Sequence, residues 1–543
     1  MKPEATPPKD RAHQMRAAGW WPDLTVVRCL DKAVQKRPDA VAIVDHNSST
    51  GESTHLTYRE LDACSMSIAV GLWKRGIRAG DVVSVQLPNW WEFAATHLAC
   101  VRIGAITNPL MPFFRERELS FMLELAQTRV LIVPYKFRGF GYEPLAKSLI
   151  NRVASLEHVF VAGSTANTFE QELLQVPSSA DIATIAGLKQ CPNSVVQILY
   201  TSGTTGEPKG VMHTSNTLFS NIVPYTRRLG LDHHDVVLMA SPLAHQTGFM
   251  YGMMLPIYLG CKAVLQDVWG ANEAGEIVHR EAVTYTMGST PFLSDLSDQA
   301  AKQPDAFKTL RLFHSAGATI PRQLVRDSTE RLGAIIISGW GMTENGAAAT
   351  TKPTDPAEKI FETDGCPMEG MELRVVDDDG QALPPNEVGA LQVKGCSNFV
   401  GYLHRPEHYA TDQEGWFSTG DLARLDQDGY LRITGRNKDV VIRGGENIPV
   451  VEIEGLLFKH PQVREIAIVG RTDVRLGERC AAWVVPRTGQ LLSLEDLTRF
   501  LAEEGVSKTY FPEFLRIVDE LPKTPSGKIQ KFALRAQEAS LSS

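Results

Sequence analysis

The segment from Thr201 to Gly210 contains residue types that can surround a phosphate group. It reads Thr-Ser-Gly-Thr-Thr-Gly-Glu-Pro-Lys-Gly, so nearly every residue is small, hydroxylated or glycine. Glycine lets the main chain come close to a ligand, and consecutive backbone N–H groups form a concave site for an anion. Lys209 adds a mobile positive charge. The segment predicts a phosphate-binding loop, although its spacing is not that of the common P-loop, and an ordinary surface loop is the alternative.

Two other short segments contain residues that suit a nucleotide. In Ser338–Glu344, the Trp340 ring can stack on a base and the Glu344 carboxylate can hold a divalent cation. This segment lacks the Gly-x-Gly-x-x-Gly pattern of a dinucleotide site. In Ser418–Asp421, the Asp421 carboxylate can accept hydrogen bonds from the two hydroxyls of a ribose. A buried Trp, a surface Glu and an Asp that bonds its own turn are the simpler alternatives.

Two glycine-containing turns lie late in the chain. Gly435–Asp439 is followed by Gly444-Gly445-Glu446-Asn447, which is typical either of a solvated linker or of a hinge. Lys528 lies in the segment Pro522–Ile529, where Pro and Gly residues stiffen the turn around it. A lysine in a stiff turn is a candidate for a specific task, whereas an exposed lysine near a terminus normally serves only solubility.

Apolar segments predict the elements that position these loops. Val195–Tyr200 and Ile335–Ile337 are apolar, rich in β-branched residues and directly precede two of the loops, as buried strands would. Further strands are predicted at residues 41–44, 82–87, 129–133, 236–239, 262–265 and 334–338, and helices at 57–76 and 90–103. This alternation predicts an α/β fold with helices layered on a mostly parallel sheet.

The second half of the chain changes character twice. Residues 352–435 are rich in hairpin signals and predict a small barrel-like sheet, whereas residues 163–190 show no strong period and predict a polar connection. Beyond Asp439, strands at 440–442, 466–469 and 481–485 and helices at 450–459 and 494–504 predict a small α+β domain. We therefore expect a large N-terminal domain, residues 1–436, and a small mobile C-terminal domain, residues 437–543.

The composition is that of a globular protein and excludes several classes of function. The 543 residues are 43% hydrophobic and 22% charged, and a net charge of −8 gives no electrostatic case for nucleic-acid binding. Eight scattered cysteines without a Cys-x-x-Cys pair argue against a zinc site or a disulfide framework. No secretory signal and no apolar run of membrane-spanning length is visible, so we expect a cytoplasmic protein without stable membrane insertion.

The N-terminal residues 1–24 are polar, then basic, and end in Trp20-Trp21-Pro22. We expect a surface helix that docks its Trp residues on the large domain. Arg11, His13 and Arg16 lie near the two Trp residues, so a helix on a membrane surface is the alternative.

Together and in this order, the five loop segments resemble the signature motifs of the adenylate-forming superfamily, which includes acyl-CoA synthetases, peptide-synthetase adenylation domains and luciferases. The resemblance runs from about residue 30 to residue 531. It implies an AMP-forming ligase that uses ATP, Mg²⁺ and coenzyme A to turn a carboxylic acid into an acyl-adenylate and then into a thioester. Because two anions must meet in the first step, catalysis there is positioning and charge neutralisation.

The resemblance also implies roles for individual residues. The positions that match ATP- or AMP-binding residues are Thr201, Ser202, Gly203, Thr204, Thr205, Gly206, Lys209, Gly317, Ala318, Gly339, Trp340, Gly341, Thr343, Asp421, Arg436 and Lys528. Among them, Trp340 matches the residue that packs on adenine and Asp421 the ribose ligand. Thr343 matches an α-phosphate contact and Glu344 the Mg²⁺ ligand. Lys528 matches the lysine that bridges the acid carboxylate and the α-phosphate.

Other matches concern the second step and the acid. Lys438 matches the hinge between the domains, and Gly444, Gly445 and Glu446 match the loop that serves the thiol half-reaction. His245 matches the residue that orients the acid. The remaining positions expected to line the acyl pocket are Gln246, Thr247, Ser289, Ser315, Ala316 and Gly317.

The segment Ser241–Phe249 bears on the choice of acid. Relatives that select amino acids place an Asp near its start, and this chain has none, so an acid without an ammonium group is expected. The opening Trp-Trp-Pro-Asp-Leu-Thr resembles that of ligases for alicyclic acids such as cyclohexanecarboxylate; medium-chain fatty acids and aryl acids stay open. Free coenzyme A is the expected acceptor, because the chain ends soon after Lys528, and a separate carrier protein is the alternative.

Two other classes of function compete with this interpretation. An acid kinase would release ADP instead of AMP, and a binding protein would hold an adenylate without turnover. Lys528 argues against the second class. The sequence leaves the oligomeric state open, including a homodimer.

Overall fold

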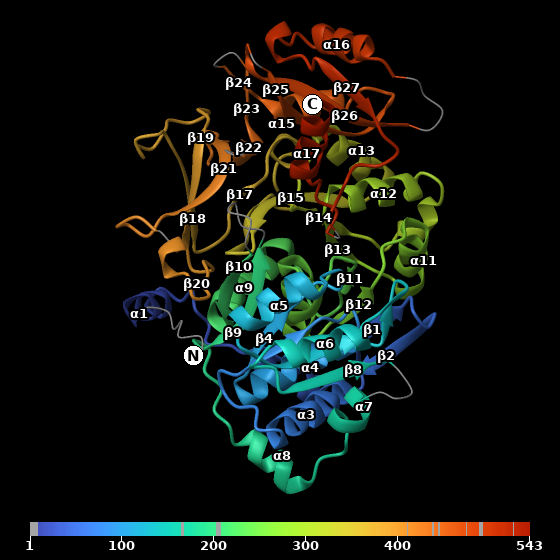
Figure 1. Ribbon diagram of the computed structural model, residues 1–543, viewed down its shortest axis with the longest axis vertical. Helices are drawn as coiled ribbons and strands as arrows, with labels where there is room; N and C mark the ends of the chain where they lie inside the picture. Colours follow the sequence, from blue (N-terminus) through green and yellow to red (C-terminus); the bar gives the residue numbers. More distant parts are fainter. Residues whose placement is uncertain are drawn as a thin grey trace.

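A computed structural model describes residues 9–163, 168–201, 208–409, 411–436, 439–443, 446–473, 475–487, 492–524 and 526–542. Two large sheets with helices around them form the body of the molecule, a four-stranded sheet lies at its side, and the C-terminal domain lies at one end (Figure 1). The α/β class that the sequence predicts is confirmed. Among the helices that the structure describes, none combines the length and apolar composition needed to cross a bilayer.

The first large sheet has seven strands in the order β20-β10-β9-β4-β3-β5-β8. The strands are β3 (Val82–Val85), β4 (Ile106–Pro109), β5 (Thr128–Pro134), β8 (His158–Ala162), β9 (Val195–Thr201), β10 (Lys209–Thr214) and β20 (Gly401–Tyr402). The five strands from β9 to β8 are parallel, and β10 runs antiparallel to both β9 and β20.

The second large sheet has nine strands in the order β17-β16-β15-β14-β13-β11-β12-β1-β2. They are β1 (Val41–Asn47), β2 (Glu52–Thr57), β11 (Val236–Met239), β12 (Lys262–Gln266), β13 (Tyr285–Gly288), β14 (Leu312–Ser315), β15 (Ile335–Met342), β16 (Gly346–Thr350) and β17 (Cys366–Pro367). The six strands from β15 to β1 are parallel; β2 pairs antiparallel with β1 at one edge, and β16 pairs antiparallel with both β15 and the other edge strand, β17. The sheet is therefore mostly parallel, as the sequence predicts.

Helices connect and cover the strands of the large domain. Every residue of α4 after Trp91 is buried, which is typical of a helix packed on all sides. The helices are α2 (Val26–Lys36), α3 (Tyr58–Lys74), α4 (Trp91–Ile103), α5 (Glu116–Leu125), α6 (Glu143–Arg152), α7 (Thr168–Leu173), α8 (Ser179–Ala186), α9 (Ser215–Leu229), η1 (Gly248–Met254), α10 (Leu255–Leu259), α11 (Ala271–Glu281), α12 (Thr290–Ala300), η2 (Pro304–Phe307), α13 (Arg322–Leu332) and α14 (Ala357–Glu362). A small hairpin joins β6 (Lys136–Phe137) to β7 (Phe140–Gly141).

The turn-rich part of the chain folds into the small sheet that its hairpin signals predict. Its order is β18-β19-β21-β22, and all neighbours are antiparallel. The strands are β18 (Met371–Val376), β19 (Gly389–Gly395), β21 (Phe417–Leu425) and β22 (Leu431–Arg436), with the short helix η3 (Pro406–His408) between β20 and β21.

The C-terminal domain has a five-stranded sheet and three α-helices, one of which ends the chain. Its strands are β23 (Val441–Arg443), β24 (Glu446–Ile448), β25 (Val463–Asp473), β26 (Gly477–Pro486) and β27 (Phe514–Ile517), and its helices are α15 (Val450–Leu457), α16 (Leu494–Glu503), η5 (Lys508–Tyr510) and α17 (Lys531–Ser542). Val441, Ile466, Val484 and Leu497 belong to a core of its own. The hinge residue Lys438 lies outside the described residues, so the domain boundary stays a prediction.

The N-terminal residues form a docked strap. Helix α1 (Lys9–Ala17) lies beside the small sheet and β20 (Figure 1). Trp21 is buried, and its Nε1–H donates to the Cys396 carbonyl at 2.9 Å. The expectation of a surface helix that docks its Trp on the large domain is confirmed. We call residues 9–24 the strap.

Two local expectations differ from the structure. The segment 163–190 contains α7 and α8, two helices of six and eight residues, where the sequence predicts only a polar connection. Strand β15 continues through Gly339–Met342, which the sequence leaves as a loop, because these residues pair with β16. Gly341 allows this pairing, since a Cβ atom there would lie 1.9 Å from the Gly346 carbonyl oxygen.

Candidate active site

The phosphate-binding loop is framed by the hairpin of β9 and β10. Thr201 ends β9, Lys209 begins β10, and the two residues face each other in the antiparallel register. The hairpin therefore fixes both ends of the loop. Its middle, Ser202, Gly203, Thr204, Thr205 and Gly206, lies outside the described residues, so its role stays a prediction.

Lys209 and Glu344 meet at the ring of Tyr402. The Lys209 Nζ atom lies 5.4 Å from the centroid of this ring, and the Tyr402 hydroxyl donates to Glu344 Oε1 at 2.8 Å. Glu344 is buried, with 6% of its surface exposed. Burial raises the pKa of its carboxyl, and the Tyr402 hydroxyl, Lys209 and Arg436 act in the opposite direction. Two cations and one buried carboxylate thus share one site.

The Glu344 carboxylate fits a magnesium ion that arrives with a nucleotide. Mg²⁺ prefers oxygen ligands and is commonly held by one or two carboxylates, water and substrate phosphates. Within the described ranges, no group of three or more His, Cys, Asp or Glu side chains could hold a metal alone. A single buried carboxylate near a lysine, here Glu344 and Lys209, suits this mode of binding.

The turn after β15 is fixed by contacts to its backbone. His213 Nε2 donates to the Thr343 carbonyl at 2.8 Å, and Asn345 Oδ1 accepts from the Met342 N–H at 3.1 Å. Burial lowers the pKa of His213 to about 4, so its ring is neutral near pH 7. Because Nε2 of this neutral ring carries the proton, Nδ1 is a hydrogen-bond acceptor. The Thr217 Oγ1 atom lies 3.0 Å from Nδ1.

Asp421 is held by two side chains that the sequence assigns to the nucleotide. The Trp340 Nε1–H donates to Asp421 Oδ2 at 2.9 Å, and Arg436 Nε pairs with Oδ1 at 2.8 Å. Asp421 and Arg436 also face each other in the register of β21 and β22. A carboxylate can accept about four hydrogen bonds, so these contacts orient Asp421 and leave acceptor capacity. Trp340 is 7% exposed, and its packing on adenine stays a prediction.

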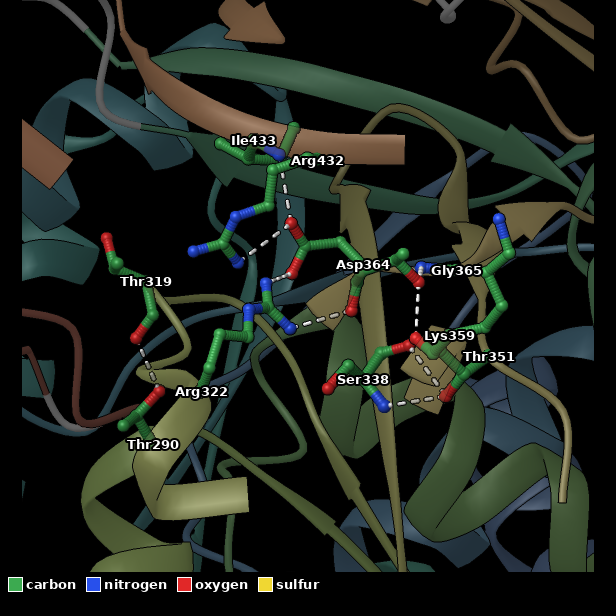
Figure 2. Close-up of polar contacts among 11 residues, drawn as sticks. Thr290, Thr319, Arg322, Ser338, Thr351, Lys359, Asp364, Gly365, Arg432 and Ile433 are labelled. Atoms are coloured by element: carbon green, nitrogen blue, oxygen red, sulfur yellow. Dashed lines mark hydrogen bonds and ion pairs between the residues drawn. The ribbon is translucent and has the colours of Figure 1, made fainter. Parts of the chain in front are cut away.

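A buried ion pair attaches β22 to helix α13. Arg322, at the start of α13, pairs with Asp364, and it also donates to the Thr363 carbonyl at 2.6 Å. Asp364 Oδ2 in turn accepts from the backbone N–H of Ile433 at 2.9 Å, and Figure 2 shows it between Arg322 and β22. Arg436 ends this strand three positions beyond Ile433. The ion pair therefore fixes the strand that carries a nucleotide-binding candidate.

The loops at the carboxyl ends of β13, β14 and β15 lie side by side. Gly288 faces Ser315, and Ser315 faces Ser338, in the parallel register. Ligands of open α/β sheets bind outside the carboxyl ends of such strands. Ser289 follows β13 and Ala316 follows β14, Gly317 and Ala318 continue the loop after β14, and Gly339 lies within β15 next to Ser338. The structure thus brings the candidates of three distant segments to one edge.

His245 is positioned at the N-terminal side of a buried π-helix, η1. The Thr247 N–H donates to His245 Nδ1 at 3.2 Å, so the proton of the neutral ring sits on Nε2, where it can be donated to a carboxylate. Burial and the positive charge of Lys528 lower the pKa of His245 to about 4. The neighbouring Gln246 is buried and accepts a hydrogen bond from Gln197 at 2.9 Å.

Lys528, in the C-terminal domain, is near enough to His245 for its charge to act on that ring. Its backbone is fixed in a turn, because the Lys528 N–H donates to Thr524 Oγ1 at 3.0 Å and its carbonyl accepts from the Thr524 N–H at 2.8 Å. Gly527 lies against Ser289, since a Cβ atom at this glycine would be 2.2 Å from Ser289 Oγ. Lys528 and Gly527 therefore lie near His245 and Ser289, and the shared role that the sequence gives to these residues stays a prediction.

The candidate residues for the thiol half-reaction lie largely outside the described residues, and two contacts in the site have no signal in the sequence. Gly444 and Gly445 lie outside the described residues, and of Glu446 only the backbone, in β24, is described. The sequence does not reveal Tyr402, which bonds the side chain of Glu344, or His213, which bonds the carbonyl of Thr343. No local pattern marks either residue; only the Gly401-Tyr402 pair next to β10 in space connects Tyr402 to the site.

Comparisons with known proteins identify the family of the chain. Residues 30–403 match the AMP-binding enzyme family, and residues 452–528 match its C-terminal domain. The medium-chain fatty-acid–CoA ligase of Escherichia coli K12 is 35% identical over 98% of this chain and 94% of its own. The salicyl-AMP ligase/salicyl-S-ArCP synthetase of Mycobacterium tuberculosis is 33% identical over 98% of this chain and 94% of its own.

A solved structure is also similar over the whole chain. The anthranilate CoA ligase AuaEII in complex with anthranoyl-AMP superposes with a TM-score of 0.84 at 25% identity, covering 96% of this chain and 98% of that one. Family, relatives and fold therefore agree with one another over nearly the whole chain. The chain belongs to the AMP-binding enzyme family and is an adenylate-forming ligase of the acid–CoA ligase type.

Proposed function

We propose that this enzyme activates a carboxylic acid with ATP and transfers the acyl group to coenzyme A. The observation that supports it most directly is that Lys528, in the C-terminal domain, is near enough for its charge to help lower the pKa of His245, while Gly527 packs against Ser289. A cation at that place would lie between the proposed acyl pocket and the proposed phosphate site at Lys209, Glu344 and Arg436. This is where an acid carboxylate and a nucleotide phosphate would have to meet.

In the first step, a carboxylate oxygen of the acid attacks the α-phosphorus of ATP, and the bond to pyrophosphate breaks. His245 holds the acid through its Nε2–H, and Lys528 offsets the repulsion between the two anions. Lys209 balances charge on the departing pyrophosphate. Such preorganised donors in a site that excludes water contribute several kcal/mol to lowering the barrier, on the order of 3 kcal/mol for a single donor.

The nucleotide would be held by the residues around Asp421. Asp421 would accept from the ribose hydroxyls, with Trp340 and Arg436 fixing its orientation, and Thr343 would face the α-phosphate. Magnesium, when bound at Glu344, would neutralise charge on the phosphates. Gly317, Ala318, Gly339 and Gly341 would line the nucleotide and acyl sites from the ends of β14 and β15.

In the second step, the thiol sulfur attacks the acyl carbonyl and AMP leaves. A rotation about Lys438 would withdraw Lys528 and present Gly444, Gly445 and Glu446 to the incoming thiol. Coenzyme A is the proposed acceptor, which agrees with the name of the relative from Escherichia coli. A carrier protein is the alternative, which the name of the relative from Mycobacterium tuberculosis favours.

The proposed acid has an uncharged body, and we propose an alicyclic acid such as cyclohexanecarboxylate. The segment Ser241–Phe249 contains no Asp to pair with an ammonium group. A medium-chain fatty acid is the alternative supported by the 35% identical relative, and an aryl acid is supported by the anthranilate and salicyl enzymes.

A panel of cyclic, linear and aromatic acids of similar size tests this proposal. The expected result is AMP formation that depends on coenzyme A and is fastest with one class of acid. Release of ADP, or no exchange of labelled pyrophosphate into ATP with any acid, would overturn the proposed chemistry.

The variant Lys528→Ala tests the assignment of the two steps. It should reduce pyrophosphate exchange by at least about 100-fold and leave thiolysis of supplied acyl-adenylate nearly unchanged. Lys523→Ala is the matched control, because Lys523 lies in the same turn and pairs with Glu465 inside the C-terminal domain at 2.6 Å. Equal loss of both half-reactions in the Lys528 variant would remove the role given to this lysine.

A further inference from the structure

Residues 396–402, which precede and include β20, make three hydrogen bonds to Glu344 and its neighbour Asn345. The Phe399 N–H donates to the Glu344 carbonyl at 2.7 Å, and Ser397 Oγ donates to the Asn345 carbonyl at 2.8 Å. The third contact is the hydrogen bond from the Tyr402 hydroxyl to Glu344 Oε1. Both the backbone and the carboxylate of Glu344 are therefore fixed by this one segment, which we call the supporting segment.

The strap forms hydrogen bonds to backbone carbonyls of the supporting segment. Arg11 donates from Nη1 to the Phe399 carbonyl at 2.9 Å and from Nη2 to the Asn398 carbonyl. Trp21 donates to the Cys396 carbonyl at 2.9 Å, and the Arg11 guanidinium lies 5.6 Å from the centroid of the Trp21 ring. Three carbonyls of the segment thus bond to two strap residues.

One peptide group connects the two sets of contacts. The carbonyl of Asn398 accepts from Arg11, and the N–H of the same peptide unit, at Phe399, donates to the Glu344 carbonyl. A charged donor on the carbonyl strengthens the N–H as a donor, because hydrogen bonds in series polarise one another. Arg11 therefore acts on the peptide that fixes the backbone of Glu344.

Aromatic packing extends the effect to Tyr402. The Phe399 ring lies 4.7 Å from that of Tyr402 and 4.7 Å from that of Tyr409, both at steep angles. Arg11 Nη1 also reaches the Tyr409 hydroxyl at 3.3 Å. A shift of Phe399 would therefore move the ring whose hydroxyl holds the carboxylate.

We propose that Arg11 is a positioning residue for the metal-binding carboxylate: from the N-terminal strap it fixes the supporting segment, and through it Glu344. The proposal rests on the proposed function, in which Glu344 binds magnesium together with ATP. Arg11 touches no substrate in this account. It sets the place and the orientation of the carboxylate that does.

If Arg11 only held the strap in place, its loss should have the same effect as the loss of another strap contact. Arg16, also in helix α1, provides this control. Arg16 pairs with Asp23 at 2.8 Å, and Asp23 binds Asn216, away from the supporting segment. Loss of Arg16 therefore weakens the docking of the strap without removing a contact to residues 396–402. A general loosening of the strap would affect the Arg11 and Arg16 variants alike.

The experiment compares ATP affinity with and without magnesium, by titration calorimetry, in the full-length enzyme. Arg11→Ala should weaken binding of ATP in the presence of magnesium about 10-fold, the usual lower range for loss of a group that orients a metal ligand. Binding of ATP in EDTA should stay unchanged. Arg11→Lys should give an intermediate loss, because a single ammonium cannot reach both carbonyls as the planar guanidinium does. Arg16→Ala should bind as the wild type does under both conditions.

Two results would overturn the role of Arg11: wild-type affinity in the Arg11 variants, or equal losses with and without magnesium. Should Arg11→Ala not fold, Arg11→Lys and Tyr402→Phe provide the same test, the second by removing only the hydroxyl on Glu344. Wild-type enzyme whose ATP affinity does not depend on magnesium would instead contradict the proposed function.

Discussion

The buried carboxyl groups of this enzyme are stabilised in different ways. Asp421 has Arg436 and the Trp340 indole, Asp364 has Arg322, and Glu344 has the Tyr402 hydroxyl with Lys209 nearby. Glu92, in the first turn of α4, is 7% exposed, and within the part of the chain that the structure describes its Oε2 atom has no hydrogen-bond partner. Buried charge without a partner is costly, so Glu92 should hold a proton.

The raised pKa of Glu92 should make the free energy of unfolding depend on pH. Burial, with a smaller effect of the Asp45 carboxylate, raises the pKa of Glu92 from 4.5 to about 8. Between these values the folded state keeps a proton that the unfolded state releases, so the free energy of unfolding falls as pH rises, by at most about 1.4 kcal/mol per pH unit. Glu92→Gln cannot release this proton. Its melting temperature relative to the wild type should therefore rise from pH 5 to pH 8.

Thermal melts of the wild type and Glu92→Gln across this pH range measure the effect. Glu124→Gln, at an exposed position of α5, is the control and should follow the wild type. Parallel curves for Glu92→Gln and the wild type would show that Glu92 ionises in the folded enzyme as it does in water.

At the scale of elements, the site depends on attaching the small sheet to the large one. The Arg322–Asp364 pair joins α13 to β22, which carries Arg436, and both side chains are nearly inaccessible to solvent. Removing one partner of a buried ion pair leaves the other charge unbalanced and typically costs about 3–5 kcal/mol. The pair is therefore a stabilising contact of the site as well as of the fold.

Asp364→Asn should lower the urea concentration at the midpoint of the first unfolding transition and weaken ATP binding. The reason is that the charged link from Arg322 through Asp364 to Ile433 of β22 is lost. Equilibrium unfolding followed by fluorescence, with ATP titration of the folded enzyme, measures both effects. Asp305→Asn, which breaks an exposed pair with Lys308 in η2, should change neither. An Asp364 variant as stable as this control would refute the attachment.

The sequence predicts regular elements better than contacts between them. Strand β11 coincides with the predicted 236–239, and α3 begins at the capping box of Thr57 and Glu60. Helices α7 and α8 were missed because six and eight residues are too short to show a helical period. Glu344 and Asp421 could be found from their motifs. Tyr402 and Arg11 could not, because they act through contacts with residues far along the chain.

At the scale of the molecule, the proposed adenylation step requires the two domains to meet at a glycine. Gly527 has a φ of +81°, and Ser289 Oγ occupies the place of its missing side chain. Ser289 Oγ itself is buried without a hydrogen-bond partner among the described residues. A side chain at residue 527 would therefore oppose the docking that brings Lys528 to His245.

Gly527→Ala should slow adenylation by at least about 10-fold, since each 1.4 kcal/mol of lost docking corresponds to a factor of ten. Thiolysis of supplied acyl-adenylate should be nearly unaffected, because the proposed rotation separates the two residues. Gly505→Ala is the control: its φ is +77° and nothing lies within 4 Å of the added Cβ. Pyrophosphate exchange and thiolysis rates measure the two steps, and recovery of exchange in the Gly527→Ala/Ser289→Ala double variant would assign the loss to this contact.

The strap also has a consequence for synthesis of the chain on the ribosome. Arg11 and Phe399 are 388 positions apart. At about 5–20 residues per second, the supporting segment is made roughly 20–80 s after the strap. During that interval Trp20 and Trp21 have no docking surface, so the nascent chain carries two exposed indoles, and chaperones that bind apolar segments should associate with its N-terminus until residue 399 has left the exit tunnel.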